Sequence, residues 1–288
     1  LVKEWDPDLI TGWNVVDFDL KVIKKRCKKL EVPFNLGRTN AESKLILKRG
    51  FFDSSKVLAE GRQVIDLLEW IRSTQKLENY KLETVAQHFL KKGKTESFTN
   101  KGQEISDWYK KDQAKLVKYN LQDAQLVLDI MEKTKVLDLY RKRSDITGLK
   151  LYEVSGSISS LDMLYLPKLR KRGYVAPSVN HGERGERITG GYVMDSKPGL
   201  YDNVVVLDFK SLYPSLMRTF NIDPMSFGKK GIEAPNGALF SKEFGVMPEI
   251  LQELWEVREQ FRKEKDEPGR YAVKIMMNSF FGVLASPL

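Results

Sequence analysis

An aspartate follows a run of valines in the segment VVVLDFKSLYPSLMRTF, residues 204–220. The run predicts a buried strand, which would place Asp208 at the strand's end. Phosphoryl transfer needs divalent ions held by carboxylates, because charge builds up on the attacking and leaving oxygens. Tyr213, fixed by Pro214, is suited to the floor of a nucleotide site, where its ring would exclude a ribose 2′-hydroxyl. A carboxylate that only caps a turn is the alternative for Asp208.

Cations at helical spacing mark the C-terminal segment, where two helices joined by the turn DEPG are predicted within residues 248–285. Arg258, Arg262 and Lys265 recur at i, i+4 and i+7, so they share one face of the first helix. Lys274 on the second helix can face the same cleft. Arginine offers a bidentate fork and lysine a point charge to the oxygens of a triphosphate. A solvated basic hairpin is the alternative.

Two uncharged residues continue the Lys274 face, since Asn278 and Phe281 follow it at i+4 and i+7 and can meet a base. A glycine in the middle of a helix, as expected for Gly282, costs about 1 kcal/mol relative to alanine. Its presence therefore favours a functional reason, such as the close approach of a flat ring pair beside Phe281. The buried stripe of the first helix is predicted to contain Ile250, Leu251 and Leu254.

These residues need elements to position them, and the first 145 or so residues predict an α/β domain. ITGWNVVDFD, residues 10–19, indicates a strand that runs into a turn, and KVLAEGRQVID, residues 56–66, indicates a hairpin turning at Glu60-Gly61. In LKVIKKRCKKL, residues 20–30, an amphipathic helix is expected to bury Val22, Ile23, Cys27 and Leu30 and to expose its lysines. Further helices are expected at about 66–74, 82–90, 104–118 and 120–134, with a loop at 91–102.

A boundary is predicted at residues 145–148, followed by a helix that ends at Gly173. Residues 176–191 are polar and glycine-rich and predict a linker. The segment GYVMDSKPGLYDNVVVLDF, residues 191–209, predicts two strands around a Lys-Pro-Gly turn. These strands would deliver Asp208 to its site.

Composition narrows the class of partner. The 288 residues carry a net charge of +9, which favours a polyanion such as nucleic acid. One cysteine fits a reducing compartment, and two histidines with that cysteine do not suit a zinc site. A run of about 18 apolar residues, which a membrane span requires, does not occur.

Five segments together resemble the family B DNA polymerases, and within them the bacterial DNA polymerase II branch. DFKSLYPS (208–215) and KIMMNSFFG (274–282) resemble the first two polymerase motifs, and GGYV (190–193) resembles the segment that links the exonuclease and polymerase modules. NVVDFD (14–19) and YNLQD (119–123) resemble the second and third motifs of the proofreading exonuclease. The five motifs follow the family's order over essentially the whole chain.

The resemblance implies a ribonuclease H-like 3′–5′ exonuclease domain at residues 1–145, the N-terminal part of the polymerase palm at 146–247 and the fingers helices at 248–288. It implies DNA-templated nucleotide addition and trimming of mispaired 3′ ends. The implied cofactor is Mg²⁺, two ions per site, with Mn²⁺ as a substitute. Implied partners are primer–template DNA, dNTPs and, for the full-length protein, a sliding clamp. The implied location is a bacterial cytoplasm, at the nucleoid.

The resemblance also implies roles for individual residues. At the polymerase site, Asp208 and Phe209 would bind the metals and Tyr213 would be the sugar gate. At the exonuclease site, Asp19 and Asp123 would bind metal and Tyr119 would orient the attacking water. The nucleotide would further contact Ser211, Leu212, Arg258, Arg262, Lys274, Asn278 and Phe281. DNA would contact Asn14, Gly190, Gly191, Tyr192 and Gly282.

Departures from the family pattern set the remaining expectations. The family usually has tyrosine where Phe281 stands, so fidelity or rate is expected to change. An Asp-x-Glu motif is expected upstream of Leu1 and an Asp-Thr-Asp motif downstream of Leu288, so the chain is expected to be a fragment that is inactive alone. The alternatives are an exonuclease with a decayed polymerase half, which Phe281 supports, and a non-catalytic DNA-binding module.

Overall fold

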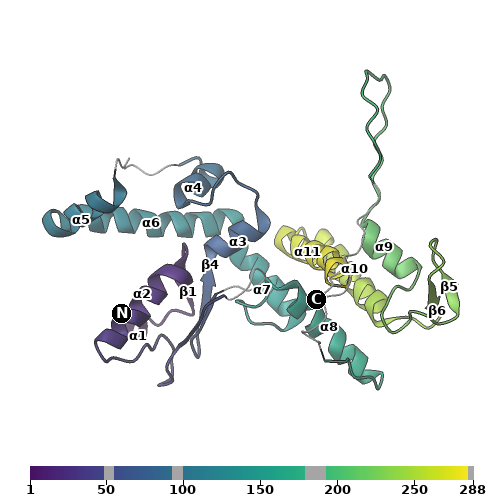
Figure 1. The fold of residues 1–288 in the computed structure, drawn as a ribbon, viewed down its shortest axis with the longest axis horizontal. Coiled ribbons are helices and arrows are strands. Elements are labelled where there is room, and N and C mark those ends of the chain that lie inside the picture. The colour runs from purple at the N-terminus through teal and green to yellow at the C-terminus, as the bar shows by residue number, and fades with distance from the viewer. Residues whose placement is uncertain (49–54, 93–99, 179–192, 285–288) are drawn as a thin grey trace. The chain divides into compact units, whose positions relative to one another are not determined.

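The computed structural model describes residues 1–48, 55–92, 100–178 and 193–284, and it divides into two compact units. The first unit comprises Leu1–Tyr140 and Lys150–Ser155, and the second comprises Arg141–Leu149 and Gly156–Leu288. Helix α7 (Val136–Thr147) runs from the first into the second (Figure 1). No helix among the described residues is long and apolar enough to cross a membrane.

The first unit alternates strands and helices as predicted. Strand β1 (Leu9–Gly12) runs parallel to β4 (Gln63–Asp66), and β2 (Lys44–Ile46) runs antiparallel to β3 (Lys56–Leu58). A bridge between Ala59 and Arg62 closes the turn from β3 to β4, which confirms the turn predicted at Glu60-Gly61. The helices are α1 (Val2–Trp5), α2 (Lys21–Lys29), α3 (Leu67–Thr74), α4 (Leu82–Leu90), α5 (Lys101–Lys111) and α6 (Gln113–Thr134).

Three predictions for this unit need correction. The turn expected after β1 is instead a π-helical segment, η1 (Val15–Leu20), whose Val15 and Val16 enter a small core. The single helix expected at 104–118 breaks at Asp112, because the Asp112 carboxylate accepts the Lys115 N–H and starts α6 there. The apolar stripe of α2 is exposed rather than buried, and only Cys27 packs against the core.

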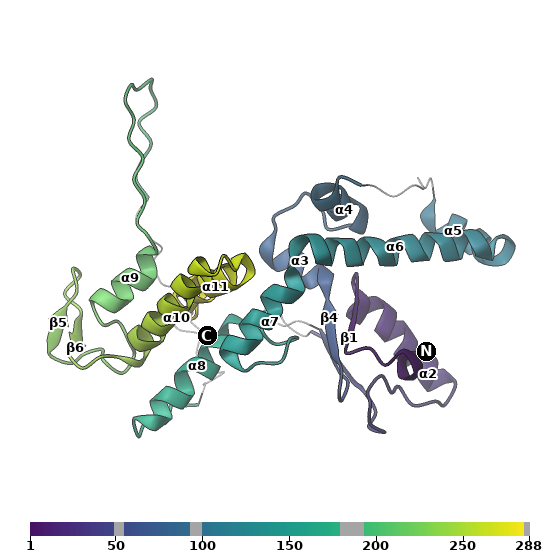
Figure 2. The same ribbon diagram turned by 180° about the vertical axis from the view of Figure 1, so that it is seen from behind.

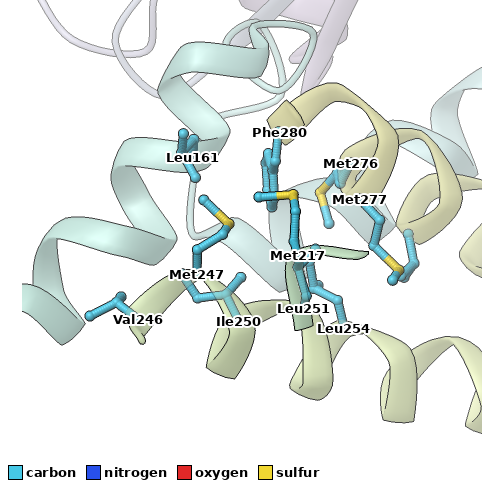
Figure 3. Close-up of a cluster of buried hydrophobic side chains, with 11 residues drawn as sticks. Leu161, Met217, Val246, Met247, Ile250, Leu251, Leu254, Met276, Met277 and Phe280 are labelled. Atoms are coloured by element: carbon cyan, nitrogen blue, oxygen red, sulfur yellow. The ribbon is translucent and has the colours of Figure 1, made fainter. Parts of the chain in front are cut away.

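The second unit is built around the predicted helix pair, α10 (Val246–Lys263) and α11 (Glu267–Leu284). Figure 3 shows their side chains converging with Leu161 of α8 (Ser157–Lys171) and Met217 of α9 (Leu212–Thr219). Full burial of one such side chain is worth about 1.5–3 kcal/mol, so this core holds the pair in place. The predicted stripe is confirmed, because Ile250, Leu251 and Leu254 are all buried.

Other details of this unit differ from expectation. Lys265 lies in the turn between α10 and α11 with a φ of 59°, so it does not share the face of Arg258 and Arg262. A short hairpin precedes α10 and consists of β5 (Gly231–Glu233) and β6 (Leu239–Ser241), which pair antiparallel. The expected helix before Gly173 is confirmed as α8, although it contains Pro167.

The valine run is the largest departure. Residues 193–210 form no strand, and Val204 to Leu207 are between 68% and 89% exposed. In Figures 1 and 2 this segment is extended and leads into α9. A strand is stabilised by hydrogen bonds to a neighbouring strand and by burial of its side chains, and the described residues supply neither here. The prediction of two buried strands was therefore wrong for this structure.

Candidate functional site

The first turn of α9 presents Tyr213 on a fixed backbone. Ser211 precedes the helix in the left-handed conformation, with φ 54° and ψ 54°. Pro214 follows within the first turn, where a helix leaves its N–H groups unbonded and proline is tolerated. Pro214 is buried, so the turn is anchored while the Tyr213 ring stays 47% exposed.

Tyr213 stacks on Phe281 of α11. The ring centroids lie 4.3 Å apart and the planes meet at 17°. Both rings are partly exposed, so together they form a flat apolar platform at the surface. An added Cβ at Gly282 would meet no heavy atom within 4 Å, so the explanation of this glycine by close ring approach is not supported by the described residues.

Cations of α10 lie beside this platform. Arg258 Nη1 donates to Ser211 Oγ over 3.1 Å, which ties α10 to the residue that starts α9. Glu259 pairs with Arg262 at 2.9 Å and with Lys210 at 3.8 Å. The Lys210 Nζ also lies 4.8 Å from the centroid of the Trp255 ring, which is within the range of a cation–π contact.

The structure thus brings together four of the predicted nucleotide-binding residues: Ser211, Tyr213, Arg258 and Phe281. Leu212, Arg262, Lys274 and Asn278 lie exposed on α9, α10 or α11, where a ligand can reach them. Asp208 and Phe209 lie in the extended segment and are exposed rather than placed at the end of a buried strand.

The segment with the second predicted exonuclease motif is fastened by a carboxylate that the sequence argument missed. Asp66 accepts the N–H groups of Asn14 at 3.0 Å, Val16 at 3.1 Å and Leu68 at 3.1 Å. It therefore caps α3 and fixes Asn14, which is itself left-handed with φ 59°. Its place directly before a helix-forming run signals the cap, but no local signal indicates its bonds to Asn14 and Val16.

Burial raises the pKa of two carboxyls in this unit. Desolvation raises the pKa of Asp66 to about 6, and the three N–H donors only partly oppose this rise. Asp19 lies in the last turn of η1 and is exposed, yet the surrounding chain removes enough water from its carboxyl to raise its pKa.

The third predicted exonuclease motif lies on α6, where Tyr119 and Asp123 are one turn apart on the same face. Tyr119 is buried and meets Trp108 of α5 edge-on at 6.0 Å, so its ring also serves the packing of α5 on α6. Throughout the described ranges, no group of three or more Asp, Glu, His or Cys side chains could hold a metal ion. Gly190, Gly191 and Tyr192 lie outside the described residues.

Two family models match the chain. The one described as DNA polymerase family B, exonuclease domain, matches residues 1–85, and the one described as DNA polymerase family B matches residues 150–286. The chain belongs to the family B DNA polymerases. Both the predicted family and the predicted fold class, an α/β exonuclease domain followed by part of a polymerase, are confirmed.

Individual family B polymerases show how much of such a protein the chain covers. It is 39% identical to DNA polymerase II of Escherichia coli K12, over 98% of this chain and 37% of that protein. It is 32% identical to the DNA polymerase of Thermococcus gorgonarius, over 98% and 39%. The solved family B DNA polymerase of Pyrobaculum calidifontis matches with a TM-score of 0.78 at 27% identity, again over 98% and 39%. The chain therefore spans less than two fifths of each.

Proposed function

We propose that the chain supplies the proofreading exonuclease module and part of the polymerase module of a DNA-templated DNA polymerase. The whole protein would add nucleotides to a primer 3′ end and remove mispaired ones. The stack of Tyr213 on Phe281 beside the Arg258–Ser211 bond carries this proposal. It joins two motifs that are distant in sequence, and both lie within the matched polymerase segment.

The exposed residues around the platform would bind a dNTP. The Tyr213 ring would lie under the sugar and leave no room for a 2′-hydroxyl. Arg258, Arg262 and Lys274 would bind the triphosphate, because guanidinium and ammonium groups complement phosphate oxygens. Arg258 would exchange the Ser211 hydroxyl for a phosphate oxygen. Leu212 and Asn278 would border the same site.

Divalent ions would be held by oxygen donors, which is the chemistry that Mg²⁺ prefers and that Mn²⁺ also accepts. Asp208 would bind through its exposed carboxylate and Phe209 through its main-chain oxygen, since a phenyl ring has no donor. Asp19 and Asp123 would serve the exonuclease site. Each bound ion would stabilise negative charge that develops on phosphate oxygens.

The whole protein would act on DNA together with partner proteins. Primer–template DNA would be the common ligand of both modules, with Asn14 and Gly282 among its contacts. A sliding clamp would be a partner of the whole protein. The single cysteine and the similarity to the E. coli enzyme support a bacterial cytoplasm, at the nucleoid.

Equilibrium binding of a fluorescent dNTP analogue to the whole protein, with and without Mg²⁺, tests the nucleotide site. We expect Asp208→Ala to remove the Mg²⁺ dependence. We expect Lys274→Ala to weaken binding about 10-fold or more, because hydrogen bonds to charged groups contribute about 1.5–3 kcal/mol. Lys230→Ala, which removes an exposed lysine near β5, is the matched control. Equal affinities of Lys274→Ala and Lys230→Ala would contradict the assignment.

The same titration separates the alternatives. An exonuclease with a decayed polymerase half, which the Phe281 departure favours, would trim 3′ ends but show no Mg²⁺-dependent dNTP binding. A non-catalytic module would bind DNA in a salt-sensitive way and show neither property.

A further inference from the structure

Helix α2 carries most of the chain's surplus charge. Six of its nine residues are basic and none is acidic. The chain as a whole has a net charge of +9, so the other 279 residues together contribute only +3 (9 minus 6). Because the excess positive charge is concentrated on one helix, its cause should be sought in what α2 itself binds.

Five of the six cations share one face of α2. Lys21, Lys24, Lys25, Lys28 and Lys29 stand at i, i+3, i+4, i+7 and i+8, and we call them the lysine face. They span about 12 Å along the helix axis, at 1.5 Å per residue. Cys27 packs against the core of the first unit. Within the lysine face, Lys25, Lys28 and Lys29 are exposed to solvent, whereas Lys21 and Lys24 are half-buried.

No acidic group among the described residues pairs with the lysine face. Of these side chains, Lys24 places its Nζ 6.0 Å from the centroid of the Phe34 ring, a distance that allows a cation–π contact. Like charges three or four residues apart on a helix repel and destabilise it. The helix dipole stabilises cations in the last turn of a helix, but Lys21, Lys24 and Lys25 lie before that turn. A polyanion would relieve this repulsion.

We propose that the lysine face of α2 is a DNA-binding surface that contacts the phosphate backbone, outside the two sites described above. Over about 12 Å of axis a duplex carries about seven phosphate charges, which is close to the five lysines available. Lysines are point charges, so the contact is independent of sequence. The face begins two residues after Asp19 and would hold DNA near the proposed exonuclease carboxylate.

An anionic membrane is the other polyanion that such a helix can meet. DNA is favoured because α2 has only nine residues and its Cys27 side is packed against the protein's own core. That leaves the exposed Val22 and Ile23 as the apolar residues of α2 that a bilayer could accept. Interfacial helices instead present a broad apolar face to the lipid.

The test compares Lys25→Gln/Lys28→Gln/Lys29→Gln with wild type in the whole protein, using anisotropy of labelled primer–template DNA across a salt series without divalent metal. We expect weaker binding and a slope of log K against log salt that is smaller by about 2 to 3, since each duplex phosphate contact contributes about 0.9. Lys25→Arg/Lys28→Arg/Lys29→Arg should keep wild-type binding.

A matched control and a lipid-binding assay complete the test. The control variant Lys76→Gln/Lys111→Gln/Lys133→Gln makes the same charge change at exposed lysines elsewhere in the first unit and should bind like wild type. If the α2 variant also binds like wild type, the surface is not where we propose. Loss of binding to phosphatidylserine vesicles with unchanged DNA binding would assign α2 to membranes instead. This proposal depends on the proposed function only for the identity of the polyanion. A protein that binds no DNA at all would refute that function.

Discussion

Asp66 is a single residue that holds two parts of the first unit together. Its carboxylate accepts N–H groups from Asn14, Val16 and Leu68, yet burial raises its pKa from the ordinary 3.8 to about 6. A carboxyl whose pKa is higher in the folded state binds its proton more tightly there. Its contribution to stability is therefore complete below pH 3.8 and is lost as the pH rises through 6.

This predicts a pH-dependent difference between the wild-type chain and Asp66→Asn, which cannot titrate at this position. One pKa unit corresponds to about 1.4 kcal/mol, so the wild type should lose about 2 kcal/mol relative to the variant between pH 4 and 7, most of the full contribution of this shift. Urea titrations at several pH values measure it. Parallel stability curves for the two proteins over that range would show that Asp66 is not the responsible group.

At the residue scale the sequence predicted the proximity of two aromatic residues better than the environment of a carboxylate. Tyr213 and Phe281 were each expected at the nucleotide site, and the structure stacks them. Asp208 was expected at the end of a buried strand and is exposed instead. Residue type and helical spacing are local properties of the sequence. The environment of a carboxylate at the end of a strand depends instead on whether that strand pairs with another one.

Helix α10 begins without a capping side chain of its own, because its N-cap residue is Gly245. Other segments supply the missing acceptors. Asp223 accepts the Met247 N–H at 2.7 Å, and Asn221 accepts the Gly245 N–H at 2.7 Å. Asp223 also accepts the Tyr165 hydroxyl of α8 at 3.2 Å. The chain that leaves α9 is thus bonded to the start of α10, which fixes Tyr213 relative to Arg258.

Replacing Asp223 with alanine should destabilise the chain by about 3 kcal/mol or more. The substitution leaves the N–H groups of Met225 and Met247 and the Tyr165 hydroxyl without this acceptor, at about 1–3 kcal/mol per buried group. Asp223→Asn keeps one acceptor oxygen and should lose about half as much. Chemical denaturation followed by tryptophan fluorescence measures both, because Trp255 on α10 contributes to that signal.

Glu253→Ala is the control for this comparison. Glu253 lies on α10, but its ion pair with Lys168 is at the surface, where such pairs are worth about 0–1 kcal/mol. A loss at Asp223→Ala no larger than that at Glu253→Ala would mean that α10 does not depend on this borrowed cap.

At the scale of elements, periodicity predicted α8, α10 and α11 because each buries a regular stripe of its own. It did not predict the break at Asp112. There the carboxylate accepts a backbone N–H and so favours the start of a new helix, an effect that the spacing of apolar residues does not reveal. Nor did it predict the exposed valine run, because a continuous apolar segment signals burial only where a partner strand exists. The cap on α10 was not predicted either, because the acceptors of its N–H groups lie in another segment of the chain.

The whole chain combines a segment matched to the exonuclease domain with one matched to the polymerase, but Asp208 is the one carboxylate that the resemblance assigns to the polymerase metals. Two divalent ions carry four positive charges, and Asp208 supplies one negative charge. Ions held about 4 Å apart repel strongly unless further carboxylates lie between or around them. Half-buried Arg258 and exposed Arg262 and Lys274 add positive charge to the same region and cannot substitute for those carboxylates.

The 288-residue chain by itself should therefore not extend a primer. With primer–template DNA, dNTPs and Mg²⁺, we expect no incorporation above background in a gel-based extension assay. The whole protein should extend the same primer under the same conditions. Incorporation by the isolated chain that disappears in Asp208→Ala would contradict this prediction, because it would mean that one carboxylate is enough to hold the ions that the reaction needs. Retained dNTP binding without extension would instead match a nucleotide platform that lacks its complete metal site.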